Sequence, residues 1–281
     1  METIVDRRVR FGELAGPLVH GSTFFDWQLI ATQEVVAMFD YSFEKLLAAG
    51  EIPFAPVAVS TSVERYPTVG DTVTVNATPR RVGDSSVEFI YEITDGDGDR
   101  FATARMTHVS ISDDGTALPL PDRVRAEFAD ASVDRTPTVG PQTGTATAVE
   151  TAPSFSSSFE IRSPHIEGVD LAYFEEYPRF ADIALEEFLA EQGSSLDDLR
   201  GEEQPYRIRD WQWEFTAPVA FESTLQVTCD VLSVDRDTIR VAHEFSSNGQ
   251  TNIEGVTEYG CFDRTGAPVP FDDELLAPFE R

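Results

Sequence analysis

Two stretches of the chain place apolar side chains at the spacing of a helix. In the C-terminal half, apolar residues recur three and four positions apart over residues 174–189, and Gly193 follows as a stop signal. In the N-terminal half a comparable pattern begins at Phe24, with Ser22 or Thr23 as the candidate N-cap. This first segment is apolar almost all round, so the sequence predicts a largely buried helix.

Strand signals follow each helix and repeat between the halves. Residues 87–93 alternate apolar and other side chains at a period of two, and residues 239–245 do the same 152 positions later. Residues 72–75 match residues 224–227 at the same spacing, and both halves end in a glycine turn followed by a proline segment. The sequence therefore predicts one α+β unit present twice, each with a helix against an antiparallel sheet.

A change of composition separates the two predicted units. Residues 129–156 are rich in Thr, Ser, Pro and Gly and have little periodic apolar pattern, which is typical of a linker. We therefore expect an N-terminal unit over residues 1–128 and a C-terminal unit over residues 157–281.

Charge narrows the choice of partner and environment. The 281 residues include 21 Lys and Arg against 50 Asp and Glu, a formal net charge of −29. Such a surface repels phosphate backbones and anionic lipids, so neither nucleic acid nor membrane is expected as a partner. Lys45 is the only lysine, and this excess of acid predicts a halophilic protein. The N-terminus has no signal-peptide core and no apolar stretch approaches ~18 residues, so we expect a cytoplasmic protein.

The cysteines and two of the histidines suggest structural rather than chemical roles. Cys229 and Cys261 are too few for a disulfide framework or a zinc site and lie in strand-like segments, so they are expected to be buried. His243 shares an alternating apolar face and is expected in the core, whereas the sequence identifies no partner for His108. Phosphate-loop, zinc-protease and serine-elbow motifs are absent from the sequence, so no metal or cofactor is expected.

Residues 161–180 hold the most specific motif. A strand ending in an apolar–arginine pair leads to a loop acid, an apolar pair, an aromatic pair and a helix that carries a tyrosine. This order resembles the hot-dog proteins of the 4-hydroxybenzoyl-CoA thioesterase type without a gap, and residues 9–13, 19–27 and 66–73 match the same family more loosely. The resemblance implies two hot-dog units in tandem, each a long central helix wrapped by an antiparallel sheet, that form an intramolecular pseudo-dimer.

The resemblance also implies an activity, the hydrolysis of acyl-CoA thioesters, with coenzyme A as part of the substrate. Glu167 stands where the family usually has its catalytic acid, as base or nucleophile, and His165 is placed to assist it. The N–H of Phe174, next to Tyr173 at the helix start, is the oxyanion donor that the family would use. Gly21 is its counterpart in the first half.

The first half carries a looser copy of this site. Its loop is one residue shorter, so Glu13 falls one place off the catalytic position and Leu14 competes for it. His20 and Ser22 flank Gly21 at the start of the first helix. Of two possible pockets, we expect only the one with the Glu167 loop to be active, completed by the first-half helix over residues 23–39.

The sequence is also compatible with other site residues and other functions. A second branch of the family places its acid on the helix, which makes Asp26 and Glu34 further candidates. A hot-dog hydratase acting on enoyl-CoA is an alternative, although the usual Asp-Asn-Pro motif of such enzymes is missing. A non-catalytic acyl-CoA-binding protein is a third possibility, and two pseudo-dimers could associate as a homodimer.

Overall fold

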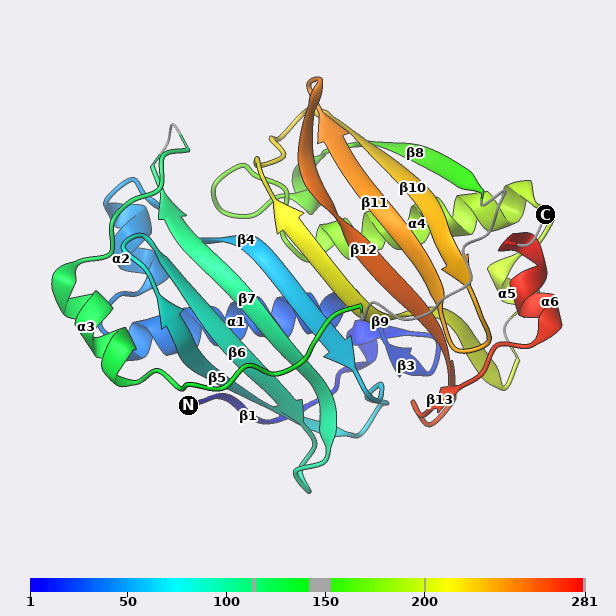
Figure 1. The fold of residues 1–281 in the computed structure, drawn as a ribbon, viewed down its shortest axis with the longest axis horizontal. Coiled ribbons are helices and arrows are strands. Elements are labelled where there is room, and N and C mark those ends of the chain that lie inside the picture. Colours follow the sequence, from blue (N-terminus) through cyan, green and yellow to red (C-terminus); the bar gives the residue numbers. More distant parts are fainter. Residues whose placement is uncertain (113–114, 142–152, 200, 280–281) are drawn as a thin grey trace.

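A single antiparallel sheet of 11 strands runs through the molecule (Figure 1). The computed structural model describes residues 1–112, 115–141, 153–199 and 201–279. Along the sheet the strands are ordered β1-β5-β6-β7-β4-β9-β12-β11-β10-β8, and β13 pairs with β12.

Both halves share a common order of elements, which is an edge strand, a 3-10 turn, a long helix, a short helix and four further strands, and they differ in the β2–β3 hairpin and in their last elements. The N-terminal half consists of β1 (Glu2–Arg8), η1 (Phe11–Glu13), β2 (Leu14–Ala15), β3 (Leu18–Val19), α1 (Ser22–Met38), α2 (Phe43–Ala48), β4 (Ile52–Val63), β5 (Thr72–Val82), β6 (Ser86–Thr94), β7 (Arg100–Ile111) and α3 (Asp122–Asp130). The C-terminal half consists of β8 (Ser154–Glu160), η2 (Ser163–His165), α4 (Glu176–Glu191), α5 (Leu196–Leu199), β9 (Glu203–Phe215), β10 (Thr224–Val234), β11 (Ile239–Ser247), β12 (Gln250–Asp263), β13 (Pro268–Val269), α6 (Asp273–Leu276) and η3 (Ala277–Phe279).

The strand order is symmetric about the middle of the sheet. From the two edges inward it reads β1-β5-β6-β7-β4 and β8-β10-β11-β12-β9, and the halves join where β4 pairs antiparallel with β9, Thr61 lying opposite Trp211. The long helices α1 and α4 lie on the same face of the sheet (Figure 1). This arrangement confirms the predicted tandem of two hot-dog units that form a pseudo-dimer.

The two central helices differ in burial, as their sequences predict. Phe24, Phe25 and Trp27 of α1 are completely buried, because the sheet and the neighbouring unit surround that helix. The helix α4 buries its apolar stripe and ends before Gly193, whose φ of +78° only glycine adopts easily. The expected N-cap was wrong: α1 begins at Ser22, and no side chain caps it.

The chain between the units runs across the sheet to the seam of β4 and β9. α3 continues to Asp130 and β8 begins at Ser154, while residues 142–152 of the expected linker lie outside the described residues. At the seam, the N–H of Gly140 donates to Ser62 Oγ at 3.0 Å. Gly140 has a φ of +85°, and a Cβ here would lie 3.3 Å from the carbonyl oxygen of Trp211, so the close approach requires glycine.

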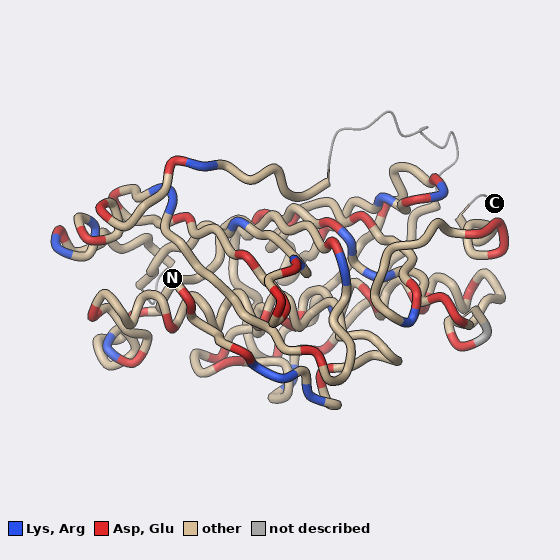
Figure 2. Tube along the Cα trace, turned by 90° about the horizontal axis from the view of Figure 1, so that it is seen from below, with Lys and Arg blue, Asp and Glu red and all other residues tan. Residues whose placement is uncertain are grey.

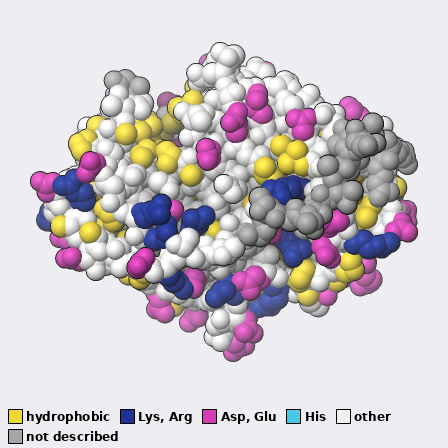
Figure 3. Space-filling view, viewed as in Figure 1, with side chains coloured by type: hydrophobic (Ala, Val, Ile, Leu, Met, Phe, Trp, Pro, Cys, Tyr) yellow, Lys and Arg dark blue, Asp and Glu magenta, His cyan; other side chains and the backbone are white. Residues whose placement is uncertain are grey.

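Acidic residues are spread along the chain of both units rather than gathered in one segment (Figure 2). On the side that Figure 3 shows, basic side chains lie among acidic ones. Several arginines pair with carboxylates, for example Arg65 with Asp95 at 2.6 Å and Arg135 with Glu92 at 2.7 Å. Within the described part of the chain, no helix is both long enough and apolar enough to cross a membrane.

Candidate active site

A cavity of about 520 Å³ lies between the two units. The N-terminal unit lines it with Leu29 and Gln33 of α1, with side chains of α2 and with the start of β4. The C-terminal unit lines it with residues of the loop over 167–174, with Tyr177 of α4 and with the end of β9. The loop of one unit thus meets the central helix of the other. Most lining side chains are apolar, as is typical of a site that binds a small molecule.

Glu167 is the one charged side chain that lines this cavity in the described structure. Its loop closes on itself, since the N–H of Glu167 donates to the carbonyl of Leu171 at 2.9 Å and Asp170 adopts a left-handed φ of 56°. Among the described residues the Glu167 carboxylate has no hydrogen bond or ion pair, and burial raises its pKa to about 7. A carboxyl with this pKa can both accept and return a proton near neutral pH.

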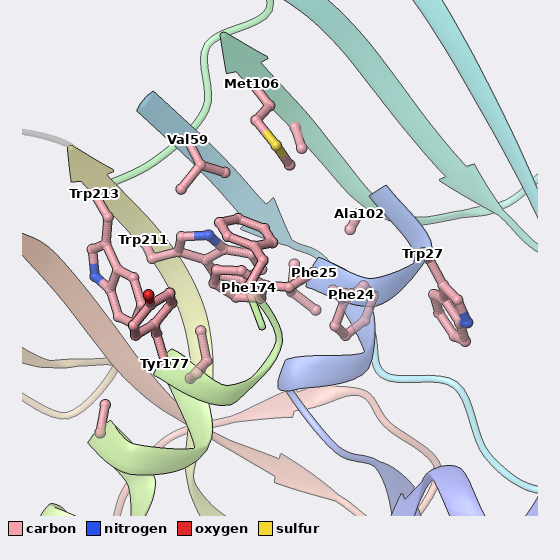
Figure 4. Close-up of a cluster of buried hydrophobic side chains, with 14 of the residues drawn as sticks. Phe24, Phe25, Trp27, Val59, Ala102, Met106, Phe174, Tyr177, Trp211 and Trp213 are labelled. Atoms are coloured by element: carbon pink, nitrogen blue, oxygen red, sulfur yellow. The ribbon is translucent and has the colours of Figure 1, made fainter. Parts of the chain in front are cut away.

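A free backbone donor lies close along the chain. The N–H of Phe174, which precedes α4 and lines the cavity, donates to no acceptor among the described residues. The Phe174 ring packs 5.0 Å from the ring of Phe25 and 5.3 Å from that of Phe215. Phe25 in turn stacks on Trp211 of β9 at 4.4 Å (Figure 4). This aromatic cluster fixes the donor at the junction of both units.

Tyr173 has a different role from Phe174. Its side chain lines the cavity, and its hydroxyl donates to Asp26 Oδ1 of α1 at 2.6 Å. Burial, followed by the bond to Asp26, raises the pKa of Tyr173, so the phenol keeps its proton. Because that proton is already donated to Asp26, Tyr173 has none to offer to a bound carbonyl.

The polar contacts continue between the starts of α1 and α4. Ser22 Oγ donates to Glu175 Oε1 at 3.1 Å, and Arg179 donates to both Glu175 at 2.6 Å and Ser22 at 3.1 Å. His20 Nδ1 lies 2.8 Å from Ser22 Oγ. Neither His20 nor Ser22 lines the cavity.

The structure places two other candidates away from the cavity. His165 accepts a bond from the Arg162 N–H at 3.1 Å through Nδ1 and packs edge-on against Phe180, so it closes the η2 turn and does not line the cavity. Glu34 is exposed on α1 and does not line the cavity either. His165 is therefore not placed to assist Glu167, and Glu34 is not placed to serve as an alternative acid in this cavity.

Glu13 is the counterpart of His165 rather than of Glu167. Its side chain accepts the Arg10 N–H at 2.6 Å, as His165 accepts that of Arg162, and it pairs with Arg7 at 2.5 Å. Because the turns η1 and η2 correspond in this way, the first loop is shorter by one residue at a later point, in the short β2–β3 hairpin.

The pseudo-symmetry of the two units relates the cavity to a second position, beside the β2–β3 hairpin of the first unit. This second position is filled by side chains, and we call it the closed position. The guanidinium of Arg207 on β9 donates to the carbonyl of Ala15. The strands β4 and β9 can be aligned at Phe54 and Tyr206, because both residues have a positive φ, 44° and 56°. Ala55 of the cavity wall therefore corresponds to Arg207, which is only 8% exposed. The larger, charged side chain occupies the space that alanine leaves open in the other site.

An acid also enters this closed position from α4. The two helix starts can be aligned by a hydrogen bond that both have: the N–H of Thr23 donates to the carbonyl of His20, and the N–H of Glu176 donates to that of Tyr173. In this alignment Leu29 of α1 corresponds to Asp182 of α4. Asp182 Oδ2 lies 3.4 Å from His20 Nε2, and burial raises the pKa of Asp182 to about 8 although Arg207 opposes the rise. Asp182 was not predicted as a site residue from the sequence, although an acid within the apolar stripe of a helix is a signal that points to it.

The remaining histidines and cysteines lie in the core. His108 is completely buried and bonds the carbonyl of Phe54 at 2.8 Å, with Tyr91 Oη 3.0 Å away. His243 lies 3.3 Å from the Cys229 thiol, and both cysteines are buried and free, as predicted. Across the described residues, no group of three or more His, Cys, Asp or Glu side chains is arranged to hold a metal ion.

The fold and the cavity between units define a tandem hot-dog protein. Residues 165–279 match the model of the thioesterase-like superfamily, which confirms the resemblance for the C-terminal unit. No curated protein matches the sequence significantly.

Solved structures share the whole architecture at low identity. A putative oleoyl thioesterase from Lactobacillus plantarum superposes with a TM-score of 0.71 at 14% identity, over 94% of this chain and 95% of that one. The 12:0-ACP thioesterase from Umbellularia californica gives 0.66 at 15% identity over 90% and 94%, and an acyl-ACP thioesterase from Bacteroides thetaiotaomicron gives 0.64 at 13% over 92% and 96%. At these identities the likeness establishes the fold.

Proposed function

We propose that the protein hydrolyses acyl thioesters, acyl-CoA first among them, in the cavity between its two units. The observation that carries the proposal is the Glu167 carboxylate, which is partly buried, has no partner among the described residues and lines a largely apolar cavity; Phe174, whose N–H is free, lines the same cavity. The superfamily match of the C-terminal unit supports this reading.

The reaction needs only water and these groups. Ionised Glu167 removes a proton from water as the oxygen attacks the thioester carbonyl, and the N–H of Phe174 hydrogen-bonds the oxyanion that forms. When the tetrahedral intermediate collapses, the carbon–sulfur bond breaks and the protonated Glu167 returns the proton to the departing thiolate. The products are a carboxylic acid and a thiol.

The same geometry disfavours the hydratase alternative. Such a lyase pairs an acid with a histidine, and no histidine lines the cavity in the described structure. The apolar walls suit the acyl group, and the phosphates of coenzyme A would remain outside the cavity.

The test is the release of free thiol from a panel of acyl-CoAs and acyl carrier proteins in molar salt. Hydrolysis of several acyl-CoAs that is lost in Glu167→Gln supports the proposal. Loss of enoyl absorbance without thiol release would identify a hydratase instead, and binding without turnover would identify an acyl-CoA-binding protein. Comparison of the rates on acyl-CoAs and on acyl carrier proteins decides which of the two carries the acyl group.

A further inference from the structure

Tyr173 makes several contacts in the site, although the proposed reaction does not use its side chain. Its backbone N–H donates to the carbonyl of His165 at 2.8 Å, which ties the two ends of the Glu167 loop together. It directly precedes Phe174, whose N–H is the candidate oxyanion donor. Its hydroxyl reaches across to α1, in the other unit.

Asp26 is held ready to receive that hydroxyl. It lies one turn into α1, beside the completely buried Phe25 and Trp27, so its backbone is fixed by the core. The neighbouring carboxylate of Glu175 is engaged by Ser22 and Arg179, at 3.1 and 2.6 Å. Asp26 does not line the cavity, and a substrate there would not touch it.

We propose that Tyr173 and Asp26 are a positioning pair, whose hydrogen bond across the two units holds the loop carrying Glu167 and the N–H of Phe174 in register with α1. This inference rests on the proposed thioesterase function. The cavity has walls from both units, so a shift of the loop relative to α1 moves the carboxylate and the oxyanion donor away from an acyl group that α1 helps to hold. Misplacement by about an ångström costs up to a hundredfold in rate.

The corresponding residues at the closed position make different contacts. There Tyr173 corresponds to His20 and Asp26 corresponds to Arg179, and these contact Ser22 instead, with Nδ1 of His20 at 2.8 Å and Nε of Arg179 at 3.1 Å. The tyrosine–carboxylate bond is therefore found at the position that keeps a cavity.

The experiment compares Tyr173→Phe, Asp26→Ala and Asp26→Asn by steady-state kinetics. The first two remove the bond, so kcat should fall about ten- to a hundredfold while KM changes less than about threefold. Asp26→Asn keeps an acceptor oxygen at the same place and should retain at least about a third of kcat. The double variant Tyr173→Phe/Asp26→Ala should be no slower than either single variant, because both lose the same bond.

Tyr206→Phe is the matched control. The hydroxyl of Tyr206 donates to the carbonyl of Leu275, also at 2.6 Å, away from the cavity. Its loss should lower the unfolding midpoint without changing kcat, which separates positioning from general stability.

Each outcome has one meaning. If the wild type releases no thiol, the proposed function is wrong. If the wild type is active and Tyr173→Phe keeps full kcat, the positioning role is wrong. If Asp26→Asn is as slow as Asp26→Ala, the charge of Asp26 is what matters, and the inference is overturned in favour of Asp26 as an acid in its own right. Should Tyr173→Phe fail to fold, the comparison of Asp26→Asn with Asp26→Ala decides alone.

Discussion

Ala15 occupies in the first unit the place that Glu167 occupies in the second. In the β2–β3 hairpin, Leu14 pairs with Val19 and the next residue, Ala15, pairs with Leu18. In the corresponding loop of the second unit, Ile166 pairs with Ala172 and the next residue, Glu167, bonds Leu171. The pseudo-dimer therefore has one loop carboxylate for two related positions. Arg207 and Asp182 fill the position that lacks it.

Glu167→Gln should abolish most of the activity. The amide keeps the size of the side chain but cannot accept a proton from water, so kcat should fall about a hundredfold or more. Thiol release on the preferred acyl-CoA measures this, and circular dichroism checks the fold. Glu13→Gln is the control and should stay near wild-type turnover, because Glu13 closes a turn and pairs with Arg7. Near-full activity of Glu167→Gln would remove Glu167 from the site.

The pH dependence of activity should follow the ionisation of Glu167. The base must be ionised, so kcat/KM should rise with pH through about 7, the pKa that burial gives this carboxyl. A pH profile on a substrate that does not ionise in this range tests the expectation. A rate already independent of pH above about 5 would indicate an ordinary, solvated carboxylate.

Stability should show the opposite trend at the same residue. Burial raises the pKa of Glu167 from 4.5 to about 7 in the folded state, so the folded protein retains a proton that the unfolded chain has lost. The stability contributed by this group is present at low pH and is lost as pH rises through about 7. Urea unfolding should therefore show Glu167→Gln gaining stability over the wild type between about pH 5 and pH 8. An unchanged difference across this range would contradict the raised pKa.

Arg207→Ala should destabilise the protein strongly. Arg207 is only 8% exposed and its guanidinium donates to the carbonyl of Ala15, so Arg207→Ala loses this hydrogen bond and empties a packed position, at a cost of about 2 kcal/mol. Arg207→Met with Asp182→Leu should recover much of the loss. Arg209→Ala is the control on the same strand; its pair with Asp210 is partly exposed and 3.8 Å long, so less than about 1 kcal/mol is expected. Equal losses at both arginines would argue against the view that Arg207 fills a packed position.

Salt should stabilise the fold. With a net charge of −29, repulsion between carboxylates grows as the Debye length increases from about 3 Å at 1 M salt to about 10 Å at 0.1 M. Thermal unfolding midpoints should rise with sodium chloride and change little with an uncharged sugar of matched osmolality. A midpoint that is flat in salt would contradict the predicted halophilic character.

The sequence by itself determined the repeated unit and its parts. The apolar period over residues 174–189 predicted α4, and the alternation at residues 87–93 and 239–245 predicted β6 and β11, because a face that must be buried imposes its own spacing on the chain. The gapless motif also singled out Glu167 and Phe174, since both belong to one short local segment.

Only the tertiary structure decided how the two loops differ and which position is closed. From the residue count, Glu13 or Leu14 was expected near the position that corresponds to Glu167, but the hydrogen bonds of the turns place Ala15 there. The meeting of Arg207 with Ala15, 192 positions apart, depends on the pairing of β4 with β9. The Tyr173–Asp26 bond likewise joins residues 147 positions apart. Such contacts follow from how two units pack against each other, and a one-dimensional pattern carries no record of that packing.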